Sequence, residues 1–188
     1  MRADSDSQVA RAELRDASKR DIEAIATLHA DSWRRHYRGA YSDEFLDGDI
    51  FTDRRAVWSD RLASTRVRAN QCTIVAELGG VLVGFAHTIL DEDPKWGALL
   101  DNLHVRHDLK GHGIGSKLMA ETARAVLDRT PSSGLYLWVL EQNEAAQSFY
   151  DARGGTCAGC EISQAPGGGS VVGLRYVWPD PSVLIGGK

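Results

Sequence analysis

The apolar positions along the 188-residue chain recur at two spacings, and these spacings predict its strands and helices. Alternating or continuous apolar runs predict strands at residues 12–15, 71–78, 81–90, 99–105, 135–140, 156–163 and 171–178. Apolar residues at helical spacing predict helices that start after Ser18, at Thr52 or Asp53, after Gly115, and at Glu144. The order β-α-α-β-β-β-α-β-α-β-β predicts an α/β (α+β) fold, with a mixed, mostly antiparallel sheet of about seven strands flanked by helices.

Glycine and proline positions add the turns and the limits of the domain. Gly79-Gly80 predicts a two-residue hairpin turn, and Gly84 predicts a bulge or bend inside its strand. Pro131 ends the helix that follows Gly115. We expect a single domain over residues 11–179, a mobile tail over residues 1–10, and an irregular Pro/Gly-rich tail over residues 180–188.

The composition narrows the class of protein. A hydrophobic fraction of 43% and a charged fraction of 26% are those of an ordinary soluble domain. The formal net charge of −4 argues against a nucleic-acid partner, which would favour a basic surface. No run reaches the roughly 20 apolar residues of a membrane span. Residues 1–10 also lack the apolar core of a secretory signal, so we expect a cytoplasmic protein without a membrane partner.

The three cysteines are Cys72, Cys157 and Cys160. Cys157 and Cys160 have the C-x-x-C spacing, but the motif lacks the second pair of a metal site and the flanking fold of a redox motif. We interpret it as two small residues in a strand near a bend, and we predict no metal site. An odd, small number of cysteines favours a reducing cytosol.

The strongest chemical signal lies between the strand at 99–105 and the helix that follows. Gly111, Gly113 and Gly115 alternate there, so side chains are absent where a ligand would approach the backbone. The first amides of a helix lack intrahelical partners and carry the positive end of its dipole, which favours an anion such as a phosphate. The spacing matches neither a P-loop nor the Gly-x-Gly-x-x-Gly dinucleotide fingerprint.

The spacing that fits is Arg/Gln-x-x-Gly-x-Gly/Ala, which Lys110-Gly111-His112-Gly113-Ile114-Gly115 meets with Lys in the first place. This stretch resembles the pyrophosphate loop of the GCN5-related N-acetyltransferase (GNAT) superfamily. A second block supports the resemblance, because Asn143 is followed seven residues later by Tyr150, as in that family. The resemblance extends from about residue 12 to residue 178, and it implies a sheet that splays between its fourth and fifth strands.

The resemblance implies acetyl-CoA as the cofactor. The loop and the helix start would hold the pyrophosphate, and the main chain of the preceding strand would pair with the pantetheine arm as an added strand does. Asn143 would hold that arm from the other side, with Tyr150 near the sulfur. Lys110 lacks the planar fork of Arg, so its expected role is to add positive charge near a phosphate. The expected cofactor-binding residues are Leu103, His104, Val105, Lys110, Gly111, His112, Gly113, Ile114, Gly115, Ser116, Asn143, Phe149 and Tyr150.

Transfer of an acetyl group to an amine requires three chemical roles. The amine must lose a proton, the oxyanion needs a hydrogen-bond donor, and the leaving thiolate gains from an acid. Tyr150 is the expected acid, and a backbone amide near His104 or Val105 is the expected oxyanion donor. Asp101 is the first candidate for the base, and His104, on the opposite face of the strand, is the second.

Each role has a structural alternative. Tyr150 is also explained as an amphipathic helix residue with its hydroxyl at the rim, and Asn143 as a helix cap, which is compatible with its role at the cofactor. For Asp101 the alternative is a structural salt bridge, and the sequence leaves both open. A family position that is often acidic, two residues before Asp101, is Leu99 here, which weakens a transferred base assignment. The third candidates for the base, which we expect to be structural, are His87 and Glu77.

The expected acceptor side lies between the first two helices. Trp33, Tyr37 and Tyr41 resemble the family's acceptor-side wall, where aromatic rings and Asp101 would hold a cation or an apolar part of the substrate. Ordinary packing is the alternative, and it is favoured for Trp33. The sequence therefore predicts an N-acetyltransferase that moves the acetyl group of acetyl-CoA to a primary amine by direct attack in a ternary complex. The acceptor would be a small molecule, an amino acid, a peptide or a protein N-terminus.

Two other functions remain open at this stage. A GNAT module that binds acyl-CoA without catalysis, as a sensor or scaffold, is the main alternative, and the presence of both Tyr150 and Asp101 favours the enzyme. A dinucleotide oxidoreductase is more distant because the glycine spacing is wrong. The oligomeric state is left open between a monomer and a homodimer.

Overall fold

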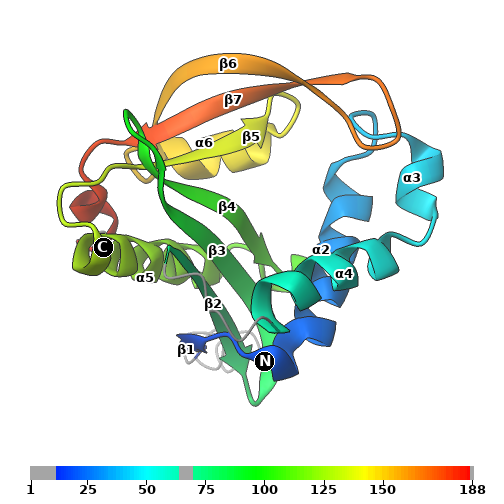
Figure 1. Ribbon diagram of the computed structural model, residues 1–188, viewed down its shortest axis with the longest axis horizontal. Coiled ribbons are helices and arrows are strands. Elements are labelled where there is room, and N and C mark those ends of the chain that lie inside the picture. The colour runs from blue at the N-terminus through cyan, green and yellow to red at the C-terminus, as the bar shows by residue number, and fades with distance from the viewer. Residues whose placement is uncertain (1–11, 64–69, 187–188) are drawn as a thin grey trace.

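The computed structural model describes residues 12–63 and 70–186, which form one sheet with helices on both faces (Figure 1). The strands are β1 (Glu13–Asp16), β2 (Gln71–Leu78), β3 (Val81–Asp93), β4 (Gly97–Val105), β5 (Leu135–Leu140), β6 (Thr156–Gln164) and β7 (Ser170–Trp178). The helices are α2 (Ile22–His36), α3 (Asp43–Asp47), α4 (Ile50–Ala63), α5 (Ile114–Arg129) and α6 (Glu144–Asp151). Short 3-10 helices are η1 (Lys19–Asp21), η2 (His107–Leu109) and η3 (Pro181–Leu184). The predicted fold class is confirmed.

The seven strands pair in the order β1-β2-β3-β4-β5-β7-β6. Neighbouring strands are antiparallel except β4 and β5, which run parallel and pair only at Ala98↔Leu135 and Leu99↔Tyr136. Beyond these two pairs the strands separate, and a cavity opens between them. The predicted splay between the fourth and fifth strands is therefore confirmed.

Two bulges interrupt the central strands. In β3 the pairing with β2 slips by one residue beside Gly84, where the sequence predicted a bulge or bend. In β4 the pairing with β3 slips between Leu100 and Asn102, so Asp101 is the extra residue. A bulge ends the strict alternation of side chains between the two faces of a sheet. The face of the sheet on which the Asp101 side chain lies therefore cannot be deduced from the alternation of its neighbours.

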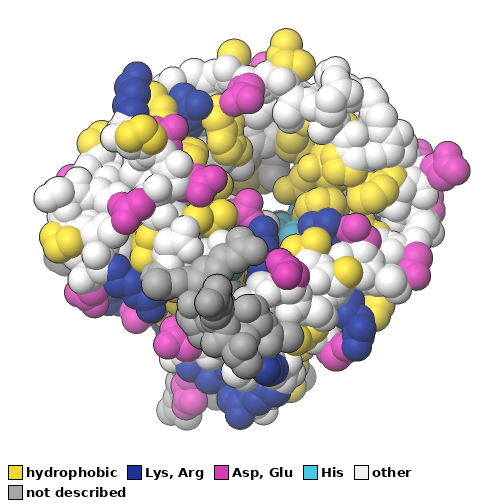
Figure 2. Space-filling model, in the orientation of Figure 1, with side chains coloured by type: hydrophobic (Ala, Val, Ile, Leu, Met, Phe, Trp, Pro, Cys, Tyr) yellow, Lys and Arg dark blue, Asp and Glu magenta, His cyan; other side chains and the backbone are white. Residues whose placement is uncertain are grey.

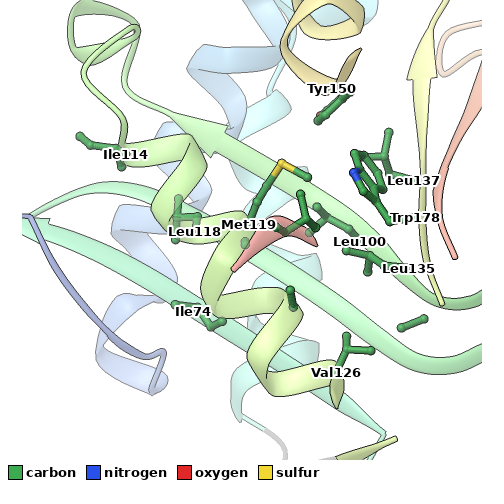
Figure 3. Close-up of a cluster of buried hydrophobic side chains, with 14 of the residues drawn as sticks. Ile74, Leu100, Ile114, Leu118, Met119, Val126, Leu135, Leu137, Tyr150 and Trp178 are labelled. Atoms are coloured by element: carbon green, nitrogen blue, oxygen red, sulfur yellow. The ribbon is translucent and has the colours of Figure 1, made fainter. Parts of the chain in front are cut away.

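The main hydrophobic core lies between α5 and one face of the sheet (Figure 3). α5 buries the side chains of Leu118, Met119 and Val126, whose spacing is that of one helix face. The sheet supplies Ile74, Leu100, Leu135, Leu137 and Trp178. Complete burial of side chains of this size stabilises a fold by about 1.5–3 kcal/mol each. This packing fixes α5, and with it the glycine loop at its N-terminus.

The opposite face of the sheet is covered by α2 and α4. Ile25 and Leu28 of α2 and Trp58 of α4 pack against Val75 and Phe85 of the sheet. A separate cluster joins α2, α3 and α4 through buried Ala30, Leu46 and Ile50. These contacts hold the C-terminal end of α2 near β4, where the cavity lies.

The segment between the first two predicted helices differs from the prediction. α3 was not predicted; it is a short helix whose N-cap, Ser42, accepts a hydrogen bond from a backbone amide of the first turn (3.2 Å). α4 begins at Ile50 and not at Thr52 or Asp53. The Asp49 carboxylate accepts a hydrogen bond from the Thr52 amide (3.1 Å), which starts the helix earlier.

The C-terminal segment is also more ordered than expected. Residues after 179 were predicted to be irregular, but they include η3, which packs against α5. Pro181 and Leu184 are buried there, and Leu184 joins the main core. Tertiary contact therefore orders a segment whose local sequence favours no helix or strand. The tail predicted at residues 1–10 lies outside the described residues.

Candidate active site

A cavity of about 500 Å³ lies where β4 and β5 separate. Its walls come from α2, β4, the glycine loop, the first turn of α5, β5 and α6. The predicted cofactor and catalytic residues that line it are Asp101, Leu103, His104, Val105, Lys110, Gly111, Gly113, Ile114, Gly115, Ser116, Asn143, Phe149 and Tyr150. Of the predicted acceptor residues, Tyr37 and Asp101 line it, whereas Trp33 and Tyr41 do not; His112 also lies outside the lining.

The glycine loop has the backbone conformation that favours glycine. Gly111 (φ 81°) and Gly113 (φ 82°) are left-handed, and Gly113 is the N-cap of α5. A β-carbon at either position would meet no protein atom within 4 Å, whereas one at Gly115 would lie 3.2 Å from the Phe149 ring. Bare backbone, open space and the positive end of a helix dipole therefore coincide. This cradle fits the diphosphate of coenzyme A.

Lys110 connects the loop to α2. Its ammonium Nζ lies 2.8 Å from Nε2 of His36. Burial lowers the pKa of Lys110, and burial together with the nearby Lys110 charge lowers the pKa of His36. The neutral His36 ring therefore accepts the hydrogen bond that the ammonium group donates.

The sequence analysis missed Arg153, which lines the cavity beside the loop. Its Nε donates a hydrogen bond to Ser116 Oγ (3.0 Å), Nη2 donates to the same oxygen, and Nη1 donates to the Phe149 carbonyl (3.3 Å). The guanidinium carbon lies 3.9 Å from the centre of the Phe149 ring. Burial lowers its pKa, and no carboxylate of the described residues forms an ion pair with it. The available signal was a single basic residue shortly after Tyr150.

Asn143 and Tyr150 lie at the two ends of α6. Asn143 Oδ1 accepts a hydrogen bond from an amide in the first turn of the helix (3.2 Å), so this residue caps α6 and also lines the cavity. Tyr150 is 8% exposed, and its ring packs against Phe149, Tyr176 and Trp178 at centroid distances of 5.4, 5.7 and 5.9 Å. Burial raises the pKa of Tyr150 well above its usual value, so its hydroxyl stays protonated at neutral pH.

His104 points from β4 toward α2. Its Nδ1 lies 2.8 Å from Ser32 Oγ, and its ring centroid lies 4.7 Å from that of His29. Burial lowers the pKa of His104 to about 3, so the imidazole is neutral at physiological pH. His29 is fixed in turn, because its Nδ1 accepts a hydrogen bond from the Trp58 indole (3.0 Å).

Asp101 forms an ion pair with Arg61 of α4, with Oδ2 2.8 Å from Nη2. Asp101 and His104 were predicted on opposite faces of the strand, and this prediction is wrong. Arg61 of α4 and Ser32 of α2, their respective partners, lie on the same side of the sheet. The bulge at Asp101 is the reason, because the extra residue interrupts the alternation. The salt bridge that the sequence left open is present.

The three predicted acceptor-side aromatic residues form one cluster. Ring centroids lie 5.3 Å apart for Trp33 and Tyr37, 5.2 Å for Trp33 and Tyr41, and 4.7 Å for Tyr37 and Tyr41. Arg54 of α4 covers the Trp33 ring at 4.1 Å, and the cluster packs on buried Leu46. Trp33 and Tyr41 therefore support Tyr37, which reaches the cavity.

Two contacts join the segment after α2 to the C-terminal half of the sheet. Gln142 Nε2 donates a hydrogen bond to the Arg38 carbonyl (3.0 Å), which links the loop after β5 to the turn after α2. At the tip of the β6–β7 hairpin, a β-carbon on Gly167 would overlap Ser42 and Phe45. Figure 1 shows this hairpin reaching α3, and Figure 2 shows the opening beneath it, with hydrophobic side chains along one side.

The third candidates for the base do not line the cavity. His87 is buried with Nδ1 2.7 Å from Thr73 Oγ1, and burial lowers its pKa to about 3. Glu77 forms an ion pair with Arg15 where β1 and β2 pair. Both side chains make structural contacts.

The cysteine motif lies in β6, outside the cavity lining. Cys157 and Cys160 are exposed in β6, and the pairing with β7 is irregular between them. This agrees with the interpretation of small residues in a strand near a bend. Within residues 12–63 and 70–186, no three His, Cys, Asp or Glu side chains gather as a metal site requires. In the same ranges no helix is long and apolar enough to cross a membrane.

The sequence profile of the acetyltransferase (GNAT) family matches residues 22–154, a range that includes the glycine loop, Asn143 and Tyr150. The chain therefore belongs to the GNAT family, and the resemblance stated from the motifs is confirmed. It is an acetyltransferase. Enzymes of this family use acetyl-CoA, which confirms the cofactor predicted from the sequence.

Individual proteins that are similar to this chain are also named N-acetyltransferases. YuaI of Bacillus subtilis, an uncharacterized N-acetyltransferase, is 27% identical over 176 residues, which cover 91% of this chain and 95% of that protein. A spermidine N(1)-acetyltransferase of Thermoplasma acidophilum is 26% identical over 146 residues, which cover 76% and 86% respectively. The crystal structure of PaiA N-acetyltransferase from Thermoplasma acidophilum with coenzyme A has a TM-score of 0.66 at 20% identity, covering 89% of this chain and 99% of that chain.

Proposed function

We propose that this protein transfers the acetyl group of acetyl-CoA to a primary amine by direct attack in a ternary complex. The acceptor is a small molecule, an amino acid, a peptide or a protein N-terminus. The observation that carries the proposal is that one cavity connects the glycine loop to both Tyr150 and Asp101. No cysteine among the described residues lines this cavity, which supports direct attack over a thioester on the enzyme.

The loop and α5 would hold the phosphate end of the coenzyme. The backbone of residues 110–115 and the hydroxyl of Ser116 would bind the diphosphate at the head of α5. Open space over Gly111 and Gly113 and the unneutralised charge of Arg153 support this fit. Lys110 would add positive charge nearby.

The two diverging strands would hold the pantetheine arm. Beyond the last β4–β5 pair, Leu103 and Val105 have no partner strand on the β5 side, so their main chain is available to an added extended segment. Asn143 would bound the arm from the α6 side, where it lines the same cavity. Acetyl-CoA supplies an acetyl group joined to a good leaving group, and the chain's own residues orient it.

Tyr150 would assist the departing thiolate. Its hydroxyl is protonated, and a free thiol has a pKa of about 8.5. Because burial raises the pKa of Tyr150 above that of a thiol, we assign it a hydrogen bond to the developing thiolate more than a complete loss of its proton. A backbone amide near His104 or Val105 would donate to the acyl oxygen as negative charge develops there.

Asp101 would accept the proton of the amine, directly or through water. Asp101 lines the cavity at the β4 bulge, and Tyr37 of α2 lines the same cavity. His104 is the weaker candidate, because a pKa of about 3 makes its neutral imidazole a poor proton acceptor. Its contact with Ser32 supports a role in shaping the wall.

The non-catalytic alternative requires the coenzyme cradle but neither of the two groups just described. A module that only binds acyl-CoA has no need for a protonated Tyr150 and a carboxylate at Asp101 in the same cavity. Their presence together favours the enzyme.

A thiol-release assay with acetyl-CoA against a panel of amines, amino acids, aminoglycosides and peptides tests the proposal. Acetyl-CoA at one hundred times its dissociation constant should also raise the free energy of unfolding by about 2.7 kcal/mol. Stabilisation without thiol release for any acceptor would favour the binding module. The absence of both would contradict the proposal.

A further inference from the structure

We call the part of the cavity lined by Tyr37 and Asp101 the acceptor end. It carries one carboxylate, and a guanidinium group neutralises this carboxylate. Asp101 is the only acidic side chain among the described residues that line the cavity. It pairs with Arg61 at 2.8 Å, and the two side chains are only 30% and 23% exposed. Arg61 Nη1 also donates a hydrogen bond to Asn102 Oδ1 (2.9 Å), so two consecutive residues of the β4 bulge hold the guanidinium. The pair leaves no net charge at this end.

The charges farther out do not change this balance. Arg54, which covers the Trp33 ring, is paired with Asp53 (2.8 Å). Two acidic residues of α3, Asp43 and Asp47, are 73% and 63% exposed and share the guanidinium of Arg38. The third, Glu44, is also exposed, and none of the three lines the cavity. Among the described residues that line the cavity, Asp101 therefore supplies the one carboxylate, and it is paired with Arg61.

Apolar and aromatic side chains also form much of the cavity wall. The Gln142–Arg38 hydrogen bond joins the loop after β5 to the turn that follows Tyr37. Aromatic Tyr37 and Trp138 line the cavity on opposite sides, from α2 and β5. A cationic group that enters this space loses water and finds no free anionic partner, which is unfavourable.

On the basis of the function proposed above, we propose that the acceptor is a small amine with a single ammonium group, and that Arg61 is the residue that sets this preference. A polyamine would carry additional ammonium groups into a space whose one carboxylate is already paired. The relative from Thermoplasma acidophilum is named for spermidine, so the two proteins would share a fold and differ in the charge of the acceptor end.

Equilibrium binding to the protein saturated with coenzyme A tests this without requiring transfer. Pentylamine and putrescine have chains of equal length, and putrescine replaces a terminal methyl group with a second ammonium group. Calorimetric titration should show pentylamine binding at least about tenfold more tightly than putrescine, and spermidine should bind no better than putrescine. Thiol release with the same amines tests the transfer function separately.

Arg61→Met should free Asp101 and remove the preference for pentylamine. The diamine carries twice the charge of the monoamine, so putrescine should gain about tenfold relative to pentylamine, and this gain should shrink at high salt. Arg61→Gln retains a donor for Asn102 without the charge and should behave like Arg61→Met. Arg61→Lys retains the charge and should keep the wild-type ratio. Any change in the basicity of Asp101 affects both amines alike, so it does not alter the ratio of their affinities.

Arg55→Met is the matched control, because Arg55 lies on the same helix and pairs with Glu23 away from the cavity. It should leave the ratio unchanged. Putrescine or spermidine bound by the wild type as tightly as pentylamine would overturn the inference, as would the absence of binding by all three amines. An unchanged ratio in both folded Arg61→Met and Arg61→Gln would also overturn it. Selective binding of pentylamine without thiol release would contradict the transfer function and leave the inference supported.

Discussion

The guanidinium of Arg153 occupies a position beside the first turn of α5, where it donates two hydrogen bonds to one oxygen, Ser116 Oγ. That oxygen is one of the groups expected to bind the coenzyme diphosphate, so the guanidinium is within reach of the same phosphate. The contact joins residues 37 positions apart. Local spacing cannot reveal such a contact, and for this reason Lys110 was the only cation assigned to this site from the sequence.

Arg153→Met should weaken coenzyme A binding by about tenfold or more, because a hydrogen bond to a charged group is worth about 1.5–3 kcal/mol. Isothermal titration with coenzyme A measures this loss, and titration with pantetheine, which lacks the diphosphate, should be unaffected. Arg124→Met removes a charge from an exposed position of α5 that pairs with Glu121, and it is the control. Equal affinity of the Arg153 variant and the wild type for coenzyme A would exclude this role.

Tyr150→Phe removes one oxygen from a buried position of α6 and keeps the ring contacts with Tyr176 and Trp178. We expect kcat to fall about 10²-fold with the dissociation constant of coenzyme A nearly unchanged, because proton donors act in the transition state. Steady-state kinetics and titration separate the two quantities. Tyr136→Phe, a buried tyrosine of β5 outside the cavity, should retain kcat. A Tyr150 variant with wild-type kcat would identify the tyrosine as a packing residue.

At the scale of elements, the sequence predicted the seven strands of the described residues, most of them from a regular apolar pattern. Elements that depend on contacts distant in the chain were missed: α3 and η3 are short, and η3 is held by burial of Leu184 against α5. The bulge at Asp101 was missed for a related reason. Reading alternation through residues 99–105 assumes regular pairing with β3, and only the partner strand shows where pairing slips.

The junction of loop and helix was predictable because it depends on the backbone alone. Gly113→Val should abolish coenzyme A binding, since the side chain would enter the open space over the loop and a left-handed φ of 82° is unfavourable for valine. Gly168→Val is the matched control: its φ is 98°, its β-carbon also meets open space, and it lies at the tip of the β6–β7 hairpin. Titration should show normal affinity for the control. Retained affinity in Gly113→Val would place the diphosphate elsewhere.

At the scale of the whole molecule, the face of the sheet covered by α2 and α4 encloses three histidines in their neutral form. Burial lowers the pKa of His87 and of His104 to about 3, and it lowers that of His29. Their side chains lie among Trp58 and Phe85, in the packing between the sheet and α2 and α4. The packing on this side of the sheet is therefore linked to the protonation state of these histidines.

The free energy of unfolding should fall as the pH drops from about 6.5 toward 3. Between these values the unfolded chain binds protons at these histidines and the folded chain does not, so the stability is complete above pH 6.5 and declines below it. Each such histidine contributes about 1.4 kcal/mol per pH unit, so His87 and His104 together contribute about 3 kcal/mol per pH unit. Urea unfolding at a series of pH values measures the slope.

His87→Gln separates this cause from the titration of carboxylates. Glutamine can still bond to Thr73 but does not titrate, so the slope below pH 6.5 should become shallower by about 1.4 kcal/mol per pH unit. The comparison uses slopes, so a constant loss of stability in the variant does not affect it. If His87→Gln keeps the wild-type slope, His87 is protonated in the folded protein and its burial does not exclude the charge.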